Sequence, residues 1–394
     1  MRAWTERRKK WVRMAAVIGA VLVFLYVVRA VYTFTFYKAS VWFPSYLASL
    51  FASQETVADA RKHVVFLMVD HYEPGRDEEA EARSERWLVR FRAIAERHHD
   101  SYGNRFRYSW FYPYDEHREQ VLAGLCLAAA EGYGEVELHW HHPRSDSQRF
   151  PAMLDDAIRW FQHHDALVSA GPNPRTQFGF IHGVWALDDS QPRCGVRREL
   201  DILFQHGCYA DFTFSTIGTV SQPRKINSIY YATDSDAPKS YDTGEDVTVG
   251  KPIEDRLMIF EGPIGLNWIT WRLDYAAVEA WARPTPGRIL RWIGANIHVQ
   301  GRPEWVFVKV YSHGIQSQDV ILDHDLDGML RSLEEICRAR GITLHYVTAR
   351  EAYNLVKAAE AGKSGNPEDF RDYRVPKPAT STLLQRRASA ASGL

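Results

Sequence analysis

The chain has few cysteines and no nucleotide-binding loop, and both absences narrow the classes of function open to it. Its four cysteines lack any C-x-x-C spacing, which argues against a zinc ribbon or a dithiol redox motif. Neither G-x-x-x-x-G-K-[ST] nor G-x-G-x-x-G occurs, and no internal repeat is visible. Cys194 and Cys208 can pair as a disulfide in an exported domain, or can stay as buried free thiols.

An excess of positive charge is also missing from most of the chain. The 394 residues include 48 basic and 49 acidic residues and are 45% hydrophobic, which is an ordinary globular composition. Without residues 1–38, 40 basic and 48 acidic residues remain, a net charge of −8. Because nucleic-acid affinity depends on clustered Lys and Arg, this composition argues against nucleic acid as a partner.

The N-terminus resembles a membrane anchor. Residues 1–13 include six basic residues, and the following fifteen residues, Met14–Val28, carry no charge. Arg29 interrupts an apolar stretch that continues to Tyr37, long enough for a spanning helix whose terminal Arg reaches the interface. The basic flank predicts a cytoplasmic N-terminus, a transmembrane segment over 14–37 and an extracytoplasmic body. A cleaved signal peptide is the alternative, although no small-x-small site follows the apolar run.

The body alternates apolar, strand-like runs with helical patterns from about residue 61 to residue 362. Continuous apolar runs such as HVVFLMV (63–69) are typical of buried parallel strands. Seven or eight such units predict a parallel sheet covered by helices, either a barrel or a doubly wound sheet. Residues 38–60 are expected to be a juxtamembrane spacer, and 363–394 a disordered tail.

Polar side chains follow several of the predicted strands. Asp70 ends the first strand, where a carboxylate can act as a general base, bind a metal, or cap the next turn. His139, His141 and His142 end the third strand. In an extended chain His139 and His141 share one face, and His142 replaces His141 if the chain curls. Imidazoles at this spacing fit zinc, with a solvated polar loop as the alternative.

Two later strands also end in candidate site residues. His313 can protonate a leaving group or play a structural role. His182 and Trp185 can line a substrate pocket, where the indole would stack on a sugar ring, and core packing is the alternative for Trp185. Asp188 and Asp189 can orient a neighbouring histidine.

In this order, Asp70, the histidines of 139–142 and His313 resemble the motifs of the NodB-type polysaccharide deacetylases over residues 60–360. The resemblance implies a distorted (β/α)7–8 barrel of parallel strands, preceded here by one transmembrane helix. It also implies a divalent metal, usually zinc, and removal of N- or O-acetyl groups from a polysaccharide.

The motifs depart from that family at three points. The family's first strand ends in two aspartates, a base and a metal ligand, whereas this chain has Asp70-His71. His71 therefore takes the ligand position, or Asp70 binds the metal itself. The family's motif histidines are four residues apart, and here only spacings of two and three are available. Arg224, in the stretch QPRK, is a candidate for the family's later arginine motif.

The implied activity is a membrane-anchored, extracytoplasmic, metal-dependent hydrolase that deacetylates a polysaccharide or lipid-linked glycan, with Asp70 as base and His313 as acid. The expected metal ligands are His71, His139, His141 and His142. The expected substrate-binding residues are His182, Trp185, Asp188 and Arg224. One alternative is a glycoside hydrolase that uses Asp70 with Asp188 or Asp189. The other is a non-catalytic glycan-binding or assembly protein.

Overall fold

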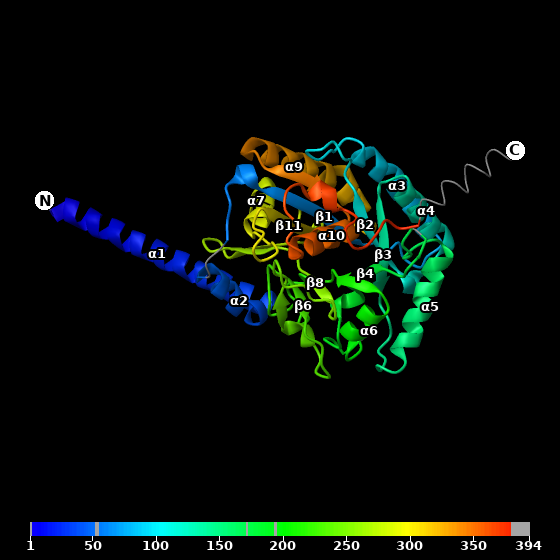
Figure 1. Cartoon of the computed structure of the whole chain (residues 1–394). Helices are drawn as coiled ribbons and strands as arrows, with labels where there is room; N and C mark the ends of the chain where they lie inside the picture. The colour runs from blue at the N-terminus through cyan, green and yellow to red at the C-terminus, as the bar shows by residue number, and fades with distance from the viewer. Residues whose placement is uncertain (1, 52–54, 171, 193–194, 380–394) are drawn as a thin grey trace.

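The computed structural model describes the chain except for residues 1, 52–54, 171, 193–194 and 380–394, and its body is a mixed α/β fold around one large sheet (Figure 1). The described residues form ten strands of that sheet and a separate two-stranded hairpin. The sheet contains β1 (His63–His71), β2 (Tyr108–Pro113), β3 (Gly134–Trp140), β4 (Phe178–His182), β5 (Cys208–Asp211), β6 (Ile229–Ala232), β7 (Gly244–Asp246), β8 (Met258–Phe260), β11 (Trp305–Ser312) and β12 (Thr343–Tyr346). The hairpin contains β9 (Ile264–Asn267) and β10 (Arg272–Tyr275).

The first strand is an interior strand of the sheet, paired on both sides, and its apolar run is buried. Within the sheet, β1 pairs in parallel with β11 on one side, and with β2 and β12 on the other. The order continues β2-β3-β4-β5-β8-β6-β7, parallel up to β8 and antiparallel around β6. The carboxyl ends of β1, β3, β4 and β11 therefore lie at the same end of the sheet, and the candidate site residues predicted from the sequence lie there.

The closed barrel expected from the sequence is not confirmed, because the strand pairings describe an open sheet. No ladder among the described residues joins β7 or β8 to β11. Instead, an isolated bridge between Ala277 and Tyr311 partly covers the free edge of β11.

Helices cover both faces of the sheet, at the places where their apolar periodicity predicts them. Trp87 and Phe91, four residues apart on one helix, lie in the larger hydrophobic core against β1 and β2. The body helices are α3 (Ala80–Ala95), α4 (Glu119–Ala130), α5 (Phe150–His163), α6 (Glu199–Gln205), α7 (Pro286–Gly294), α8 (Gln318–Val320), α9 (Leu326–Arg340) and α10 (Ala349–Glu360). A π-turn over Ile321–Asp325 joins α8 to α9.

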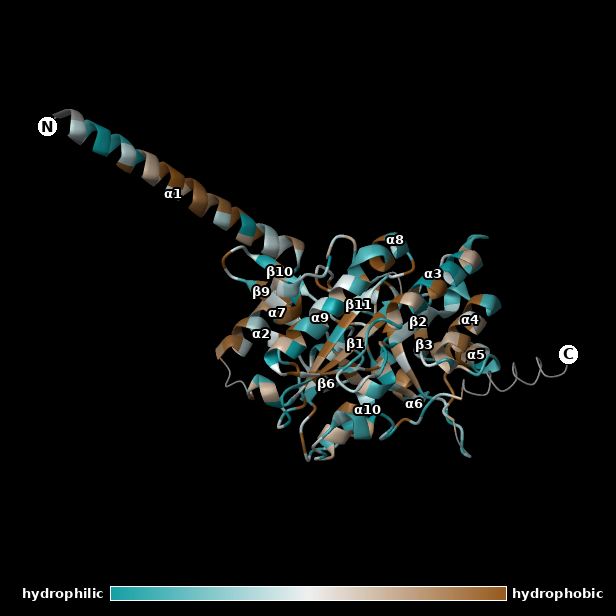
Figure 2. Cartoon of the chain, turned by 90° about the horizontal axis from the view of Figure 1, so that it is seen from above, coloured by the Kyte–Doolittle hydropathy of each residue, from teal (hydrophilic) through white to brown (hydrophobic). Residues whose placement is uncertain are grey.

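A long helix, α1 (Arg2–Phe36), projects from the body (Figures 1 and 2). Its residues Glu6–Phe36 are long and apolar enough to cross a membrane, and the most apolar window is not buried against the rest of the chain. Residues 38–60, expected to be a spacer, include a second helix, α2 (Ala39–Phe51). Trp42 and Tyr46 of α2 pack against the hairpin, so α2 belongs to the folded body.

Part of the expected C-terminal tail is also folded. A 3-10 turn over Pro367–Phe370 follows α10. Arg371 forms ion pairs with Glu351 and Glu368, and Val375 is buried. The rest of the tail lies outside the described residues, as does Cys194. Cys208 is a buried free thiol rather than half of a disulfide.

Candidate metal centre

The carboxyl ends of β1 and β3 carry the same pattern, with polar residues at alternate positions. His71 is the last residue of β1 and Glu73 lies two residues beyond it, while His139 is the penultimate residue of β3 and His141 directly follows that strand. Because alternate residues of an extended chain share a face, each pair points to one side of the sheet. His139 is fully buried and His71 nearly so, whereas Glu73 and His141 are partly exposed.

Glu73 is the point at which these side chains converge. Its Oε1 lies 2.9 Å from Nε2 of His139 and 3.2 Å from Nε2 of His141. The outer nitrogens of both rings have partners of their own. Nδ1 of His139 donates to the backbone oxygen of Ile181 at 2.8 Å, and Nδ1 of His141 donates to Oδ1 of Asp115 at 3.2 Å.

These outer hydrogen bonds determine which ring atom is free to bind an ion. A neutral imidazole that donates through Nδ1 carries a lone pair on Nε2, and in their neutral forms both rings would direct that lone pair at the carboxylate oxygen of Glu73. A ring nitrogen and a carboxylate oxygen that both carry lone pairs come this close only when a proton or a metal ion lies between them. Two histidines and a carboxylate, with outer-shell partners on the rings, are a donor set that zinc favours.

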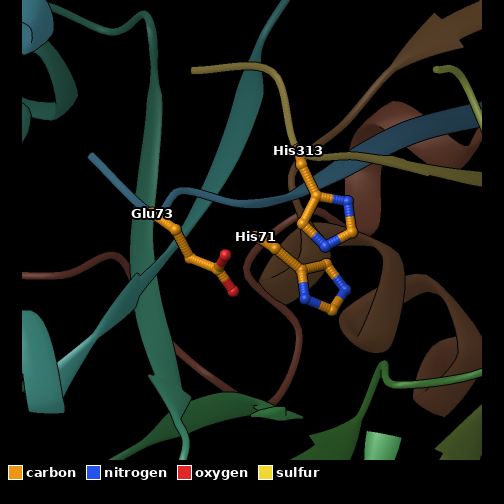
Figure 3. A group of neighbouring side chains, drawn as sticks. All are labelled: His71, Glu73 and His313. Carbon is orange, nitrogen blue, oxygen red and sulfur yellow. The ribbon is translucent and has the colours of Figure 1, made fainter. Parts of the chain in front are cut away.

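His71 and His313 form the other side of the site (Figure 3). Their ring centroids are 4.5 Å apart, and together with Glu73 they make a second group that could hold an ion. His313 is oriented by Glu279, whose Oε1 accepts from Nδ1 of His313 at 2.7 Å and from its backbone N–H at 2.9 Å. Nε2 of His313 is therefore the nitrogen available for chemistry.

The pKa shifts of Glu73, His71 and His139 favour metal binding, whereas the shift of His141 favours its protonated form. Burial works to raise the pKa of Glu73, but the hydrogen bonds of His139 and His141 outweigh it and hold the pKa far below the usual value. Burial lowers the pKa of His71 and His139, which favours their neutral, metal-binding forms. Burial also works to lower the pKa of His141, but Asp115 and Glu73 raise it to about 10. Without a metal, His141 is therefore protonated at neutral pH and donates through Nε2 to the ionised carboxylate of Glu73, and a metal ion would have to displace that proton.

Two cavities open onto the site. Glu73 lines one of about 670 Å³, and His313 lines another of about 270 Å³, with Gln316 in the wall of both. Trp185 also lines the smaller cavity, and its ring centroid lies 6.2 Å from those of His71 and His313. The site is therefore open to a substrate, as a catalytic metal centre requires.

His142 and His182 belong to a different group, fully buried with Glu199. Nε2 of His142 lies 2.9 Å from Oε1 of Glu199 and 2.8 Å from Nε2 of His182. His142 points away from His139 and His141 because successive residues of a strand face opposite sides. His182 is closed off from solvent and lines neither cavity described above, so the structure does not bring it together with Trp185.

Three other predicted residues lie apart from the ligand groups. Asp70 has the strand parity of Met68 and Tyr72, which face α3, and its Oδ1 accepts from the N–H of Gly314 at 2.6 Å. Burial raises the pKa of Asp70 well above its usual value. Asp188 is buried and accepts from the N–H and the hydroxyl of Ser240, both at 2.6 Å. The guanidinium of Arg224 is largely exposed and pairs with Asp242 at 3.3 Å.

Glu73, Asp115 and Glu279 are the site residues that the sequence analysis missed. Glu73 had a usable signal, since the alternation that pairs His139 with His141 also pairs His71 with Glu73. Asp115 lies two residues after the end of β2 and had a strand-end signal similar to that of Asp70. Glu279 follows β10, a strand that was not predicted, so no pattern in the sequence indicated it as a site residue.

Comparisons with known proteins leave the function open. No family model and no curated protein sequence matches the chain. Among solved structures it is similar to one from Parabacteroides distasonis described as a "putative glycoside hydrolase/deacetylase". The identity is 12%, the TM-score is 0.33, and the match covers 75% of this chain and 71% of that one. At this distance the similarity assigns no function to the chain.

Proposed function

We propose that this chain is a membrane-anchored, metal-dependent hydrolase that removes acetyl groups from a polysaccharide or lipid-linked glycan. One observation carries the proposal: the Nε2 atoms of His139 and His141 converge on Oε1 of Glu73 beside open cavities. In this proposal Glu73, His139 and His141 hold the ion, and His71 lies next to them as a further ligand. The donor set favours zinc. The choice of deacetylation rests on the order of the motifs along the sequence.

The protein's own residues supply orientation and a proton. A bound metal would polarise the acetyl carbonyl and lower the pKa of a water molecule toward about 7. His313, held through Nδ1 by Glu279, presents Nε2 to the cavity that Trp185 also lines. There it gives a proton to the departing amine or hydroxyl. Trp185 offers an aromatic face on which a sugar ring can stack.

Release of acetate from an acetylated oligosaccharide tests the proposal directly. Full-length protein supplied with zinc should release acetate and leave the glycosidic bonds intact. The glycoside hydrolase alternative requires two carboxylates across a scissile bond. Neither Asp70 nor Asp188 is among the described residues that line the cavities beside Glu73 and His313. Shortened oligosaccharides without released acetate would favour that alternative, and zinc-loaded protein that does neither would favour a non-catalytic role.

Asp70 is expected to position the His313 loop rather than to act as the general base suggested by the sequence. In Asp70→Asn the amide oxygen can still accept from the N–H of Gly314, so metal content should be unchanged and acetate release should fall by less than about tenfold. Asp70→Ala removes the acceptor and leaves a buried N–H unsatisfied, which typically costs about 1–3 kcal/mol of stability. Thermal unfolding and acetate assays on both variants measure these effects. A loss in Asp70→Asn of about 10²-fold or more, with metal retained, would restore Asp70 as the base.

The membrane anchor is proposed from the six-charge flank and from the exposed apolar face of α1. Full-length protein should fractionate with membranes and resist extraction by alkaline carbonate, because a helix of this length is held by its buried apolar surface. The flank predicts that the body lies on the extracytoplasmic side, where added protease would reach it in intact spheroplasts. Recovery of the native protein in soluble form, cleaved after the apolar run, would show that the segment is a signal peptide.

A further inference from the structure

The β9–β10 hairpin leaves the body and lies alongside α1 (Figures 1 and 2). The hydroxyl of Tyr26 donates to the backbone oxygen of Trp268 at 3.0 Å, and the hydroxyl of Thr33 donates to that of Trp271 at 2.9 Å. The rings of Tyr26 and Trp271 also meet edge to face, with centroids 5.9 Å apart. The hairpin turn, Trp268–Trp271, is therefore packed on the helix that is proposed to cross the membrane.

These contacts give the depth of the hairpin turn. Tyr26 lies inside the charge-free run Met14–Val28. A hydrocarbon core about 30 Å thick takes about 20 helical residues, so a span that begins at Met14 ends near Thr33. The turn is bonded to α1 at both Tyr26 and Thr33. If α1 spans the bilayer, the turn must enter the leaflet on the side of the body.

Several backbone groups of the hairpin turn have protein partners and need no water. Oδ1 of Asn267 accepts from the N–H groups of Ile269 and Thr270, at 3.0 and 3.1 Å. The hydroxyl of Thr270 accepts from the N–H of Arg272 at 3.3 Å, and α1 satisfies the carbonyls of Trp268 and Trp271. Irregular backbone at membrane depth requires such partners, because no water is present to supply them.

The side chains of the hairpin turn are also suited to lipid. Residues 262–271 carry no charge, and the side chain of Ile269 at the tip is 83% exposed. Trp268 is 37% exposed, and tryptophan is enriched where proteins meet the membrane–water interface. An isoleucine side chain this exposed is unfavourable in water, and its transfer into a bilayer is favourable.

The smaller cavity of the metal centre lies at the foot of the same helix. Ile217 and Tyr275 line that cavity together with His313. The ring of Tyr275 lies 6.4 Å from the ring of Tyr37, directly after α1. A Cβ atom at Gly218 would lie 3.7 Å from the backbone oxygen of Phe36. The wall of the cavity therefore touches the end of the membrane-spanning segment.

We infer that the hairpin turn Trp268–Trp271 inserts into the phospholipid bilayer beside α1 and holds the His313 cavity at the lipid surface. The substrate of this site is then a glycan carried by a membrane lipid, which reaches the cavity while its lipid stays in the bilayer. This substrate class rests on the proposed hydrolase function, whereas the insertion of the turn depends only on α1 being in a membrane.

A fluorophore at position 269 tests the insertion. In a Cys194→Ser background of the full-length chain, Ile269→Cys is labelled with nitrobenzoxadiazole and reconstituted into phosphatidylethanolamine–phosphatidylglycerol vesicles. Val89→Cys is the matched control, because Val89 is 61% exposed on α3, at the far side of the body from α1. The label at 269 should emit at shorter wavelength and be quenched by nitroxide lipids, and the label at 89 by aqueous iodide. Equal quenching of both labels by iodide would overturn the insertion.

Acetate release from two forms of one substrate tests the substrate class. Ile269→Asp should lower release from an acetylated oligosaccharide on a dialkyl lipid in vesicles by about tenfold or more, because a charge in the bilayer is unfavourable. It should leave release from the free oligosaccharide unchanged, and Ile269→Leu should behave like the wild type on both. An equal loss on both substrates, or no loss on either, would contradict a lipid-borne substrate. Wild-type protein inactive on both would refute the hydrolase, while the fluorescence result would still decide the insertion.

Discussion

Glu73→Gln is expected to lose the bound metal and nearly all acetate release. The substitution keeps the size of the side chain but removes the charge on which the Nε2 atoms of His139 and His141 converge. An amide oxygen is a weaker ligand than a carboxylate, so the metal should leave the site. Loss of one oxyanion donor alone costs about 10²–10³-fold in rate, and loss of the metal removes water activation as well. The decrease should therefore exceed about 10³-fold.

Elemental analysis of the purified full-length variant measures its metal content directly, and the acetate assay is run on the same preparation. Glu116→Gln is the matched control, because Glu116 lines the same cavity but is bonded to the N–H of Gly75, at 2.8 Å. A glutamine there can keep that bond, so the control should retain metal and activity. Full metal content in Glu73→Gln would show that the ligand set is wrong.

His313→Ala should retain the metal and lose acetate release by about 10²–10⁴-fold, the range typical of a general acid. The loss should depend on the leaving group, because a good leaving group departs without a proton. Nitrophenyl acetate should therefore show a much smaller loss than an N-acetylated oligosaccharide. His324→Ala, an exposed histidine on the turn before α9, is the control and should match the wild type.

Two outcomes would contradict the acid role. An equal loss on both substrates would mean that His313 does not supply a proton to the leaving group. Loss of metal in His313→Ala would make His313 a ligand, which its position in one group with His71 and Glu73 allows. Measuring metal content and leaving-group dependence on the same variant separates these possibilities.

The order of strands and helices was predictable because buried parallel strands leave a clear signal. The runs at 63–69, 135–139 and 304–314 all form strands, β1, β3 and β11, at about the expected bounds. Closure of the sheet was not predictable, because it depends on which strand edges meet across the insertion. The β9–β10 hairpin has only four residues in each strand, too few for a clear apolar pattern, and α2 lies in the segment that was expected to be a spacer.

The sequence predicted only part of the candidate metal site, for the same physical reason. Alternation along a strand pairs His139 with His141 and sends His142 to the opposite side, where it meets Glu199. The same rule pairs His71 with Glu73, but the prediction at this strand end was built on Asp70 and His71 and did not include Glu73. Distant partners such as Glu279 come together only through the tertiary fold, so no local pattern indicates them.

Chelation followed by restoration of zinc tests the central claim most directly. Full-length protein in vesicles is treated with dipicolinate, assayed for acetate released from an acetylated oligosaccharide, and assayed again after one equivalent of zinc is returned. Metal-dependent deacetylation predicts that release falls to background with the chelator and returns with zinc, while Glu73→Gln stays inactive throughout. Acetate release that persists in the metal-free protein, or none from wild-type protein that holds zinc, would contradict it.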